Sequence, residues 1–276
     1  MKRNAIILTL CAAALAAAPV LAGKAITVKG SDTMVILGQR WAEKYMNANS
    51  GQVIMVTGGG SGTGIAALIN GTTDICQSSR SMKEDEKLKL RDRYQTMGIE
   101  IPVAKDGLAV YVHTNNPVQA LSVEQLGEIY LGNITNWKQV GGPDATIILY
   151  GRENSSGTYG FFKEHVLRNK DFSARVQTLP GTAAVVNAVA KDPNGIGYGG
   201  AAYAKGVRDV GVKKDASSPA VLPVAATVKD GSYPLSRPLF FYLRKSPSGD
   251  TKKFVDWVLS AEGQKLAVEV GYFPLH

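Results

Sequence analysis

The chain has 276 residues, 45% of them hydrophobic and 20% charged, with a formal net charge of +8. This length and composition predict a globular protein with one large domain or two lobes, and exclude a low-complexity chain. The basic balance suits nucleic acid, a membrane surface or a small anion. Because no run of Lys and Arg is interleaved with aromatic residues, nucleic acid is disfavoured as a partner.

Residues 1–22 form a separate segment. Lys2 and Arg3 precede an apolar, alanine-rich run that ends in a small residue, which is typical of a secretory signal peptide. The run is too short to favour a membrane anchor, so we expect an exported, periplasmic protein. Cleavage would lower the net charge to +6 and remove Cys11, leaving Cys76, which we expect to be buried and inert.

Short apolar strands alternate with amphipathic helices along the rest of the chain. In the first part we expect strands at 25–30, 53–57 and 73–77, and helices at 34–47, 65–70 and 83–94. Further on we expect a strand at 101–112 that is broken at 105–107, a helix at 121–131, a strand at 146–150, a helix from about Ser156, a helix at 182–190, a glycine-rich turn at 192–200, a strand at 239–243, and helices at 251–259 and 261–270. This alternation predicts a largely parallel sheet.

Three of the predicted strands lead into a turn rich in Ser, Thr and Gly that opens a helix. The turns are Ser31–Thr33, Ser61–Gly64 and Ser155–Thr158. A helix start exposes unpaired N–H groups and the positive end of the helix dipole, so it favours an anion. Because the carboxyl ends of parallel strands meet at one edge of a sheet, the three turns together predict an anion site. Three separate helix caps are the simpler alternative.

Three ionisable residues, Arg80, Asp106 and Arg152, end or interrupt predicted strands. Arg152 offers a planar fork that matches two oxygens of an oxyanion. A carboxylate such as Asp106 repels a fully ionised oxyanion, yet accepts a hydrogen bond from one that keeps a proton, as hydrogen phosphate does and sulfate does not. The simpler interpretations are surface arginines, a turn at Asp106, or an ion pair between Asp106 and an arginine.

Enzyme chemistry has little support in the sequence. The loop Gly58–Gly64 lacks the lysine of a nucleotide-binding P-loop and the spacing of a dinucleotide fingerprint. The three histidines do not pair at metal-ligand spacing, and Ser155–Gly157 is not a nucleophile elbow. We therefore expect no catalysis, no metal and no cofactor, and an exported phosphatase or esterase remains the alternative.

Five short motifs carry a resemblance to a known family: Gly30-Ser31-Asp32-Thr33, Gly59-Gly60-Ser61-Gly62-Thr63-Gly64, Ser78-Ser79-Arg80, Lys105-Asp106-Gly107, and Arg152 followed by Ser156-Gly157-Thr158. They resemble the periplasmic phosphate-binding proteins of ABC transporters, the PstS family, over essentially the whole chain after residue 22. The resemblance implies a type II two-lobed α/β periplasmic binding protein, with a mixed sheet flanked by helices in each lobe. It also implies a protein, expected to be a monomer, that closes on one phosphate and delivers it to permease subunits in the inner membrane.

The expected first lobe comprises residues 23–105 and 236–276, and the expected second lobe comprises residues 106–235. The two crossovers between them, near 102–107 and 236–240, would form the hinge.

The resemblance also implies a set of phosphate ligands: Ser31, Thr33, the backbone of Met34, Ser61, Arg152, Ser156, Gly157 and Thr158. In some members an Asp that accepts the phosphate proton stands where this chain has Arg80. We therefore expect Asp106 to take the acceptor role and to balance Arg80. Sulfate, molybdate or another oxyanion on the same fold is the alternative ligand.

Overall fold

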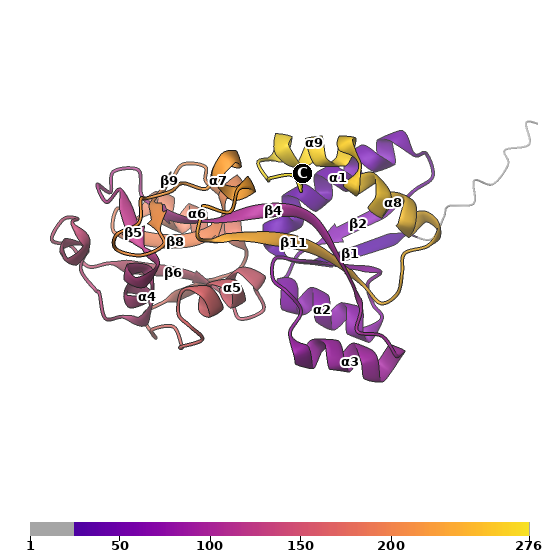
Figure 1. The fold of residues 1–276 in the computed structure, drawn as a ribbon, viewed down its shortest axis with the longest axis horizontal. Helices are drawn as coiled ribbons and strands as arrows, with labels where there is room; N and C mark the ends of the chain where they lie inside the picture. Colours follow the sequence, from indigo (N-terminus) through magenta and orange to yellow (C-terminus); the bar gives the residue numbers. More distant parts are fainter. Residues whose placement is uncertain (1–24, 276) are drawn as a thin grey trace, which may run out of the picture.

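The computed structural model describes residues 25–275, so the predicted signal peptide lies outside the described residues (Figure 1). The strands are β1 Ile26–Gly30, β2 Ile54–Thr57, β3 Ile75–Ser78, β4 Ile99–Val112, β5 Ala120–Ser122, β6 Ile148–Arg152, β7 Gln177–Leu179, β8 Gly195–Gly200, β9 Arg208–Asp209, β10 Gly211–Lys213 and β11 Ser236–Leu243. The α-helices are α1 Val35–Ala48, α2 Ser61–Asn70, α3 Glu84–Tyr94, α4 Val123–Leu131, α5 Gly157–His165, α6 Thr182–Lys191, α7 Ala225–Lys229, α8 Gly249–Leu259 and α9 Ala261–Val270. Short 3-10 helices lie between these elements, at η1 Asp32–Met34, η2 Trp137–Val140 and η3 Ala201–Tyr203.

The main sheet has nine strands in the order β2-β1-β3-β11-β4-β8-β6-β7, with β9 beside β4. Strands β1, β2 and β3 pair in parallel, and so do β6, β7 and β8. Strand β11 runs antiparallel to β3 and β4, and β4 runs antiparallel to β8 and β9. The α/β fold with a mixed sheet and flanking helices is therefore confirmed, whereas a largely parallel sheet is wrong at its centre.

Two separate cores divide the molecule into lobes. The first lobe is built around Trp41, Phe241 and Phe254, and the second around Tyr130 and Tyr198. Strands β4 and β11 lie side by side between the two groups of elements and extend into both (Figure 1). The residue limits of the lobes given above stay a prediction, because these two strands belong to both lobes.

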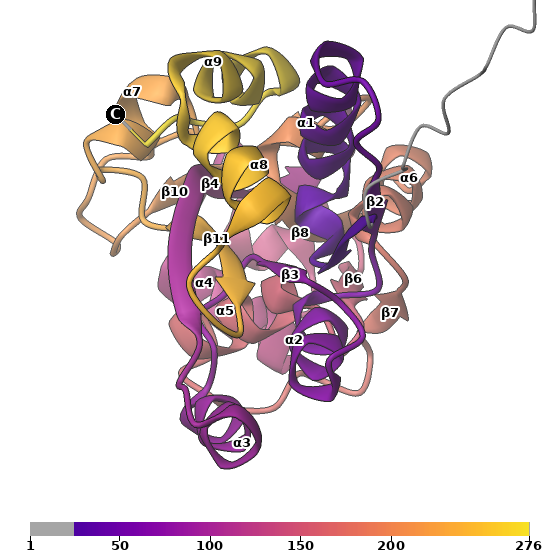
Figure 2. The ribbon, with the colours of Figure 1, turned by 90° about the vertical axis from the view of Figure 1, so that its right-hand side faces the viewer.

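Helices cover both faces of the sheet in the first lobe. Figure 2 shows α1, α8 and α9 on one side of the sheet, with α2 and α3 on the other. The Trp41 indole N–H donates to the Gly263 carbonyl at 2.8 Å, which ties α1 to α9. Cys76 is fully buried on the α2 side, as expected, and burial raises the pKa of its thiol.

Strand β4 continues through the segment at 105–107 that was expected to break it. Lys105, Asp106 and Gly107 pair in register with Pro238, Arg237 and Ser236 of β11. A side chain on Gly107 would place its Cβ atom 2.6 Å from that of Pro223, so the glycine serves close packing rather than a turn.

The predicted turn at 192–200 is also wrong over most of its length, because Gly195–Gly200 is the buried strand β8. A Cβ atom on Gly197 would lie 2.6 Å from Val185 Cγ1, and one on Gly199 would lie 2.6 Å from Thr182 Cγ2. These glycines let α6 pack directly on the strand, so the signal that indicated a turn reflects close approach.

Most other predicted elements are present, with ends that differ by a few residues. Helix α2 begins at Ser61 rather than near residue 65, directly after Gly60, whose φ of +93° favours glycine. Strands β5, β7, β9 and β10 and helix α7 were not predicted, and each is only two to five residues long. Between residues 25 and 275, no helix is long and apolar enough to cross a membrane.

Candidate functional site

The structure brings the three Ser/Thr/Gly turns together where the lobes meet. The hydroxyls of Thr33 and Thr158, from opposite lobes, are 2.8 Å apart and both are buried. The Gly62 N–H donates to the Ser155 carbonyl at 2.8 Å, also across the lobes. The N-termini of helices from both lobes therefore face the same buried region of the interface between the lobes.

Buried serine hydroxyls of the first lobe lie next to this contact between the lobes. Ser31 Oγ donates to Ser79 Oγ at 2.8 Å, and the Ser79 N–H donates to Ser61 Oγ at 3.1 Å. Gly157 lies against them from the second lobe, where an added Cβ atom would be 2.2 Å from Ser61 Oγ. Glycine at 157 is thus required for the lobes to approach this closely.

Two of the predicted ligands make hydrogen bonds within their own turns. Ser156 is the N-cap of α5, and its Oγ atom accepts from the N–H groups of Thr158 at 3.1 Å and Tyr159 at 3.3 Å. The Met34 N–H donates to the Ser31 carbonyl at 3.0 Å. Both residues lie where the turns meet, and the hydrogen bonds that they make here stabilise their own turns.

Arg152 is buried in the seam between the lobes, and its fork faces carboxylates. Its Nε and Nη2 atoms donate to Glu153 at 3.1 and 2.9 Å, and Nη2 also donates to Asp32 of the first lobe at 2.8 Å. Nη1 donates to Thr182 at 2.8 Å. Although burial acts to raise it, the pKa of Glu153 is lowered by the hydrogen bond and charge of Arg152. We call Asp32, Arg152, Glu153 and Thr182 the seam cluster.

The guanidinium of Arg80 pairs with α3. Its Nη1 and Nη2 atoms donate to Glu86 of α3 at 2.8 and 2.7 Å. The expectation that Asp106 balances Arg80 is wrong, because Arg80 has a carboxylate of its own six residues along the chain.

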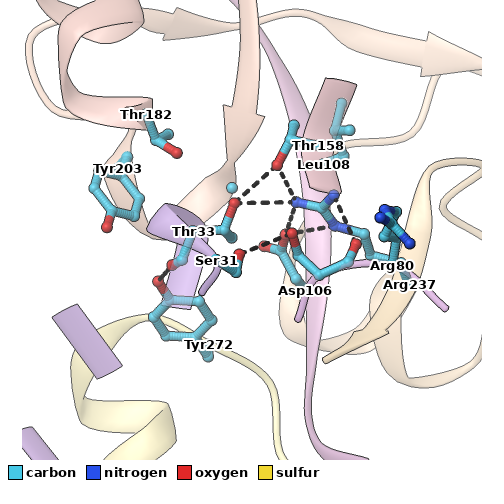
Figure 3. A network of polar contacts seen from close by, with 12 residues as sticks. Ser31, Thr33, Arg80, Asp106, Leu108, Thr158, Thr182, Tyr203, Arg237 and Tyr272 are labelled. Atoms are coloured by element: carbon cyan, nitrogen blue, oxygen red, sulfur yellow. Dashed lines mark hydrogen bonds and ion pairs between the residues drawn. The ribbon is translucent and has the colours of Figure 1, made fainter. Parts of the chain in front are cut away.

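Asp106 is paired instead with Arg237, which the sequence predictions did not include. Arg237 Nε and Nη2 donate to Asp106 Oδ2 at 3.0 and 2.7 Å, and both side chains are 1% exposed. Nη2 also donates to Thr158 Oγ1 at 3.1 Å and lies 3.5 Å from Thr33 Oγ1 (Figure 3). Burial raises the pKa of Asp106, while the charge of Arg237 acts in the opposite direction. We call Thr33, Asp106, Thr158 and Arg237 the hinge cluster.

A signal for Arg237 was present in the sequence. It opens the apolar run of β11 in the crossover that was predicted to be part of the hinge. A charged residue that enters a buried strand needs a partner, and a crossover strand places that partner between lobes. Ser79 is the second addition, since its hydroxyl joins Ser31 and Ser61.

The two histidines of the described residues make local contacts. His113 Nδ1 accepts from the Asn115 N–H, and His165 Nδ1 lies 3.0 Å from the Phe161 carbonyl. In the described range, no group of three or more His, Cys, Asp and Glu side chains could hold a metal ion. Hydroxyls, helix N-termini and an arginine that converge from two lobes are typical of an anion-binding site.

Two α/β lobes, joined by crossover strands and meeting at a buried polar cluster, define a solute-binding protein of the periplasmic type. Residues 16–262 match the family model of the PBP superfamily domain. The chain is 35% identical over 263 residues to the phosphate-binding protein PstS of Pseudomonas aeruginosa, which covers 89% of this chain and 81% of that protein. It is 37% identical over 248 residues to PstS of Staphylococcus haemolyticus, which covers 86% of this chain and 75% of that protein.

Solved structures agree with these relatives. A putative phosphate ABC transporter substrate-binding protein from Clostridium perfringens, with bound phosphate, has a TM-score of 0.84 and 30% identity over 92% of this chain and 100% of that chain. An ABC-type phosphate transport receptor from Vibrio cholerae has a TM-score of 0.73 and 31% identity over 90% of this chain and 99% of that chain. The protein belongs to the PstS family of phosphate-binding proteins within the PBP superfamily, and the two-lobed fold that the sequence motifs implied is confirmed.

Proposed function

We propose that this protein captures inorganic phosphate between its lobes and delivers it to the permease subunits of an ABC importer. The observation that carries the proposal is the meeting of Thr33 and Thr158 from opposite lobes, beside the buried serines 31, 61 and 79. Hydroxyls and helix N-termini donate hydrogen bonds to an oxyanion. Relatives that are named for phosphate binding support the same ligand.

Entry of phosphate requires the lobes to part. Thr33 Oγ1 and Thr158 Oγ1 are 2.8 Å apart, so an anion that accepts from both must separate them by its own width. Strands β4 and β11 join the lobes and are the elements that would bend. Because phosphate contacts both lobes only when they close on it, binding shifts the population towards the closed form.

The ligand set that we propose places hydroxyls on both sides of phosphate. The groups are the side chains of Ser31, Thr33, Ser61 and Thr158, with the backbone of Met34, Ser156 and Gly157 shaping the two turns around the anion. Gly157 allows the N-terminus of α5 to reach Ser61 without a side chain between them.

We propose that Asp106 selects against sulfate. Its carboxylate is buried beside the threonine hydroxyls, where it would accept a hydrogen bond from hydrogen phosphate and repel a dianion that has no proton. Asp106→Asn is expected to relax the rejection of sulfate. If the variant still ignored sulfate, Asp106 would not be the acceptor.

Export by a signal peptide would place the monomeric protein in the periplasm, where it meets the permease. We also propose that it is a transport component without catalytic activity and without a nucleic-acid partner, in keeping with its relatives. Release of product from a generic phosphate ester by the pure protein would contradict this.

Calorimetric titration of the protein from residue 23 onwards, at neutral pH, tests the proposal. Phosphate should bind one molecule per chain, and sulfate and molybdate should bind much more weakly. Preferred binding of sulfate or molybdate would replace phosphate by another oxyanion on the same fold. No heat from any of the three would contradict the anion site itself.

A further inference from the structure

We propose that Tyr203 is a positioning residue of the second lobe that holds the phosphate-binding turn of the first lobe when the lobes are closed. The inference rests on the proposed function, because it concerns how the same site closes and how long it keeps its anion. The observation that carries it is a hydrogen bond between the lobes: the Tyr203 hydroxyl donates to the Asp32 carbonyl at 2.7 Å.

Tyr203 is anchored on the second lobe. It ends η3, which directly follows strand β8. Its side chain is half-buried and packs against a cluster formed by Ala109 and Tyr111 of β4 and three valines of α6. The Tyr111 hydroxyl donates to the Gly200 carbonyl, at the start of η3. These contacts tie η3 to β4, β8 and α6, so we expect Tyr203 to move with the second lobe.

A second tyrosine hydroxyl contacts the same turn from within the first lobe. Tyr272 follows α9, is buried in the first-lobe core, and donates to the Thr33 carbonyl. Figure 3 shows Tyr203 and Tyr272 beside the turn that carries Ser31 and Thr33. The two hydroxyls therefore bind the carbonyls of adjacent residues, and they differ in that the Tyr203 bond crosses between the lobes whereas the Tyr272 bond does not.

The tyrosines act on the phosphate site through peptide groups. Each carbonyl shares a planar peptide group with the N–H of the next residue, and the C=O and N–H bonds of a trans peptide point in opposite directions. A hydroxyl on the Asp32 carbonyl therefore fixes the direction of the Thr33 N–H, and one on the Thr33 carbonyl fixes that of the Met34 N–H. Hydrogen bonds in such a chain also polarise one another. Thr33 and Met34 belong to the proposed phosphate site.

The state of Tyr203 suits a donor whose bond depends on closure. Burial and, to a smaller extent, the charge of Asp32 raise the pKa of Tyr203 to about 12, so its hydroxyl keeps its proton at neutral pH. Because its bond to Asp32 spans the lobes, the bond forms when the lobes close and breaks when they part. Loss of this hydroxyl should therefore speed opening and release, and leave the encounter of phosphate with the open form unchanged.

The test measures phosphate association and release by stopped flow for the wild type, Tyr203→Phe and Tyr272→Phe. Tyr203→Phe should release phosphate about three to ten times faster, the scale of one lost hydrogen bond, with an association rate constant that changes less than about twofold. Its urea midpoint without phosphate should match the wild type. Tyr272→Phe is the matched control, because it removes the same atom from the contact within one lobe, and it should lower the urea midpoint with and without phosphate.

Two results would overturn the inference while phosphate capture stands. One is a Tyr203→Phe release rate within about twofold of the wild type. The other is slower association with unchanged release, which would place the effect of Tyr203 on the open form. A wild type that does not bind phosphate would instead overturn the proposed function, and the inference with it.

A measurement on the wild type covers the case in which Tyr203→Phe does not fold. The NMR resonance of the ring carbon that carries the hydroxyl reports the hydrogen bond of a tyrosine labelled with carbon-13. On addition of phosphate, this resonance should shift for Tyr203 and shift less for Tyr272, whose bond lies within one lobe. An unchanged Tyr203 resonance at saturating phosphate would overturn the inference.

Discussion

The seam cluster and the hinge cluster each bury an arginine between the lobes, yet they leave its guanidinium in different states. Arg152 faces two carboxylates, one of them from the adjacent residue in the chain. Arg237 faces one carboxylate and a threonine hydroxyl. The two arginines are therefore equally buried, and they differ in the number of carboxylates that lie beside the guanidinium.

The two clusters should differ most in stability when each arginine loses one carboxylate partner. Asp106→Ala leaves Arg237 buried without its carboxylate, and should lower the free energy of unfolding by about 3–5 kcal/mol. Glu153→Ala is the matched control: Arg152 keeps Asp32, so the loss should be about 1 kcal/mol. Urea unfolding of both variants measures the difference. Equal losses would mean that the two clusters are electrostatically alike.

Closure itself can be blocked without touching a charge. Gly157→Ala places a methyl group against Ser61, so the lobes can no longer meet as they do here. Phosphate affinity should fall at least about tenfold, or about 1.4 kcal/mol. The free energy of unfolding should not fall, because Ala is the better helix former. Calorimetry and urea unfolding separate the two effects, and unchanged affinity would show that closure tolerates the methyl group.

The seam cluster should affect how long the ligand stays. Asp32→Asn removes the charge pair that crosses the lobes to Arg152, so phosphate should leave about three to ten times faster with little change in the rate of binding. Glu153→Gln is the control, because Glu153 and Arg152 lie on the same lobe. Stopped-flow release rates that are equal in the two variants would argue against a link between the lobes.

A half-buried carboxylate, Asp209, provides the smallest test. Asp209 Oδ1 is buried without a hydrogen-bond partner, and burial raises its pKa to about 6 from 3.8, against the effect of Arg208. The folded protein thus binds this proton more tightly than the unfolded chain, so stability falls as the pH rises from about 4 to about 6. Asp209→Asn should remove on the order of 0.5–1 kcal/mol of that fall, after allowance for partial exposure.

Urea midpoints at pH 4 and pH 7 for Asp209→Asn and the wild type measure this change. The difference in stability between the two pH values should be smaller in the variant. Parallel behaviour would show that Asp209 does not titrate in this window.

Much of the fold was predictable because its signals are local. The turns at Ser31, Ser61 and Ser156 end strands and open helices, and parallel pairing within each lobe brings such turns to one edge. The predictions failed where they interpreted glycine as a turn residue. At Gly107 and in β8 it marks close packing against other elements, and the chain alone does not distinguish that use from a turn.

The charges of the site were less predictable because their partners are distant in sequence. Asp106 and Arg237 are 131 residues apart, and Asp32 and Arg152 are 120 residues apart. An arginine beside a Ser-Gly-Thr turn was the visible candidate, but the acceptors that occupy it are set by tertiary packing. Glu153 was a local signal in the sequence, since the carboxylate of an adjacent residue can accept hydrogen bonds from the guanidinium of Arg152.

The burial of Cys76 has a practical consequence for the measurements described above. Its thiol is fully enclosed between β3 and α2, and its raised pKa keeps it protonated at neutral pH. Thiolate is the reactive form, so maleimide dyes should leave the folded protein unmodified. Cysteines introduced on the surface of each lobe could then carry a fluorescent pair without removal of Cys76, and slow labelling of Cys76 itself would time the unfolding of the first lobe.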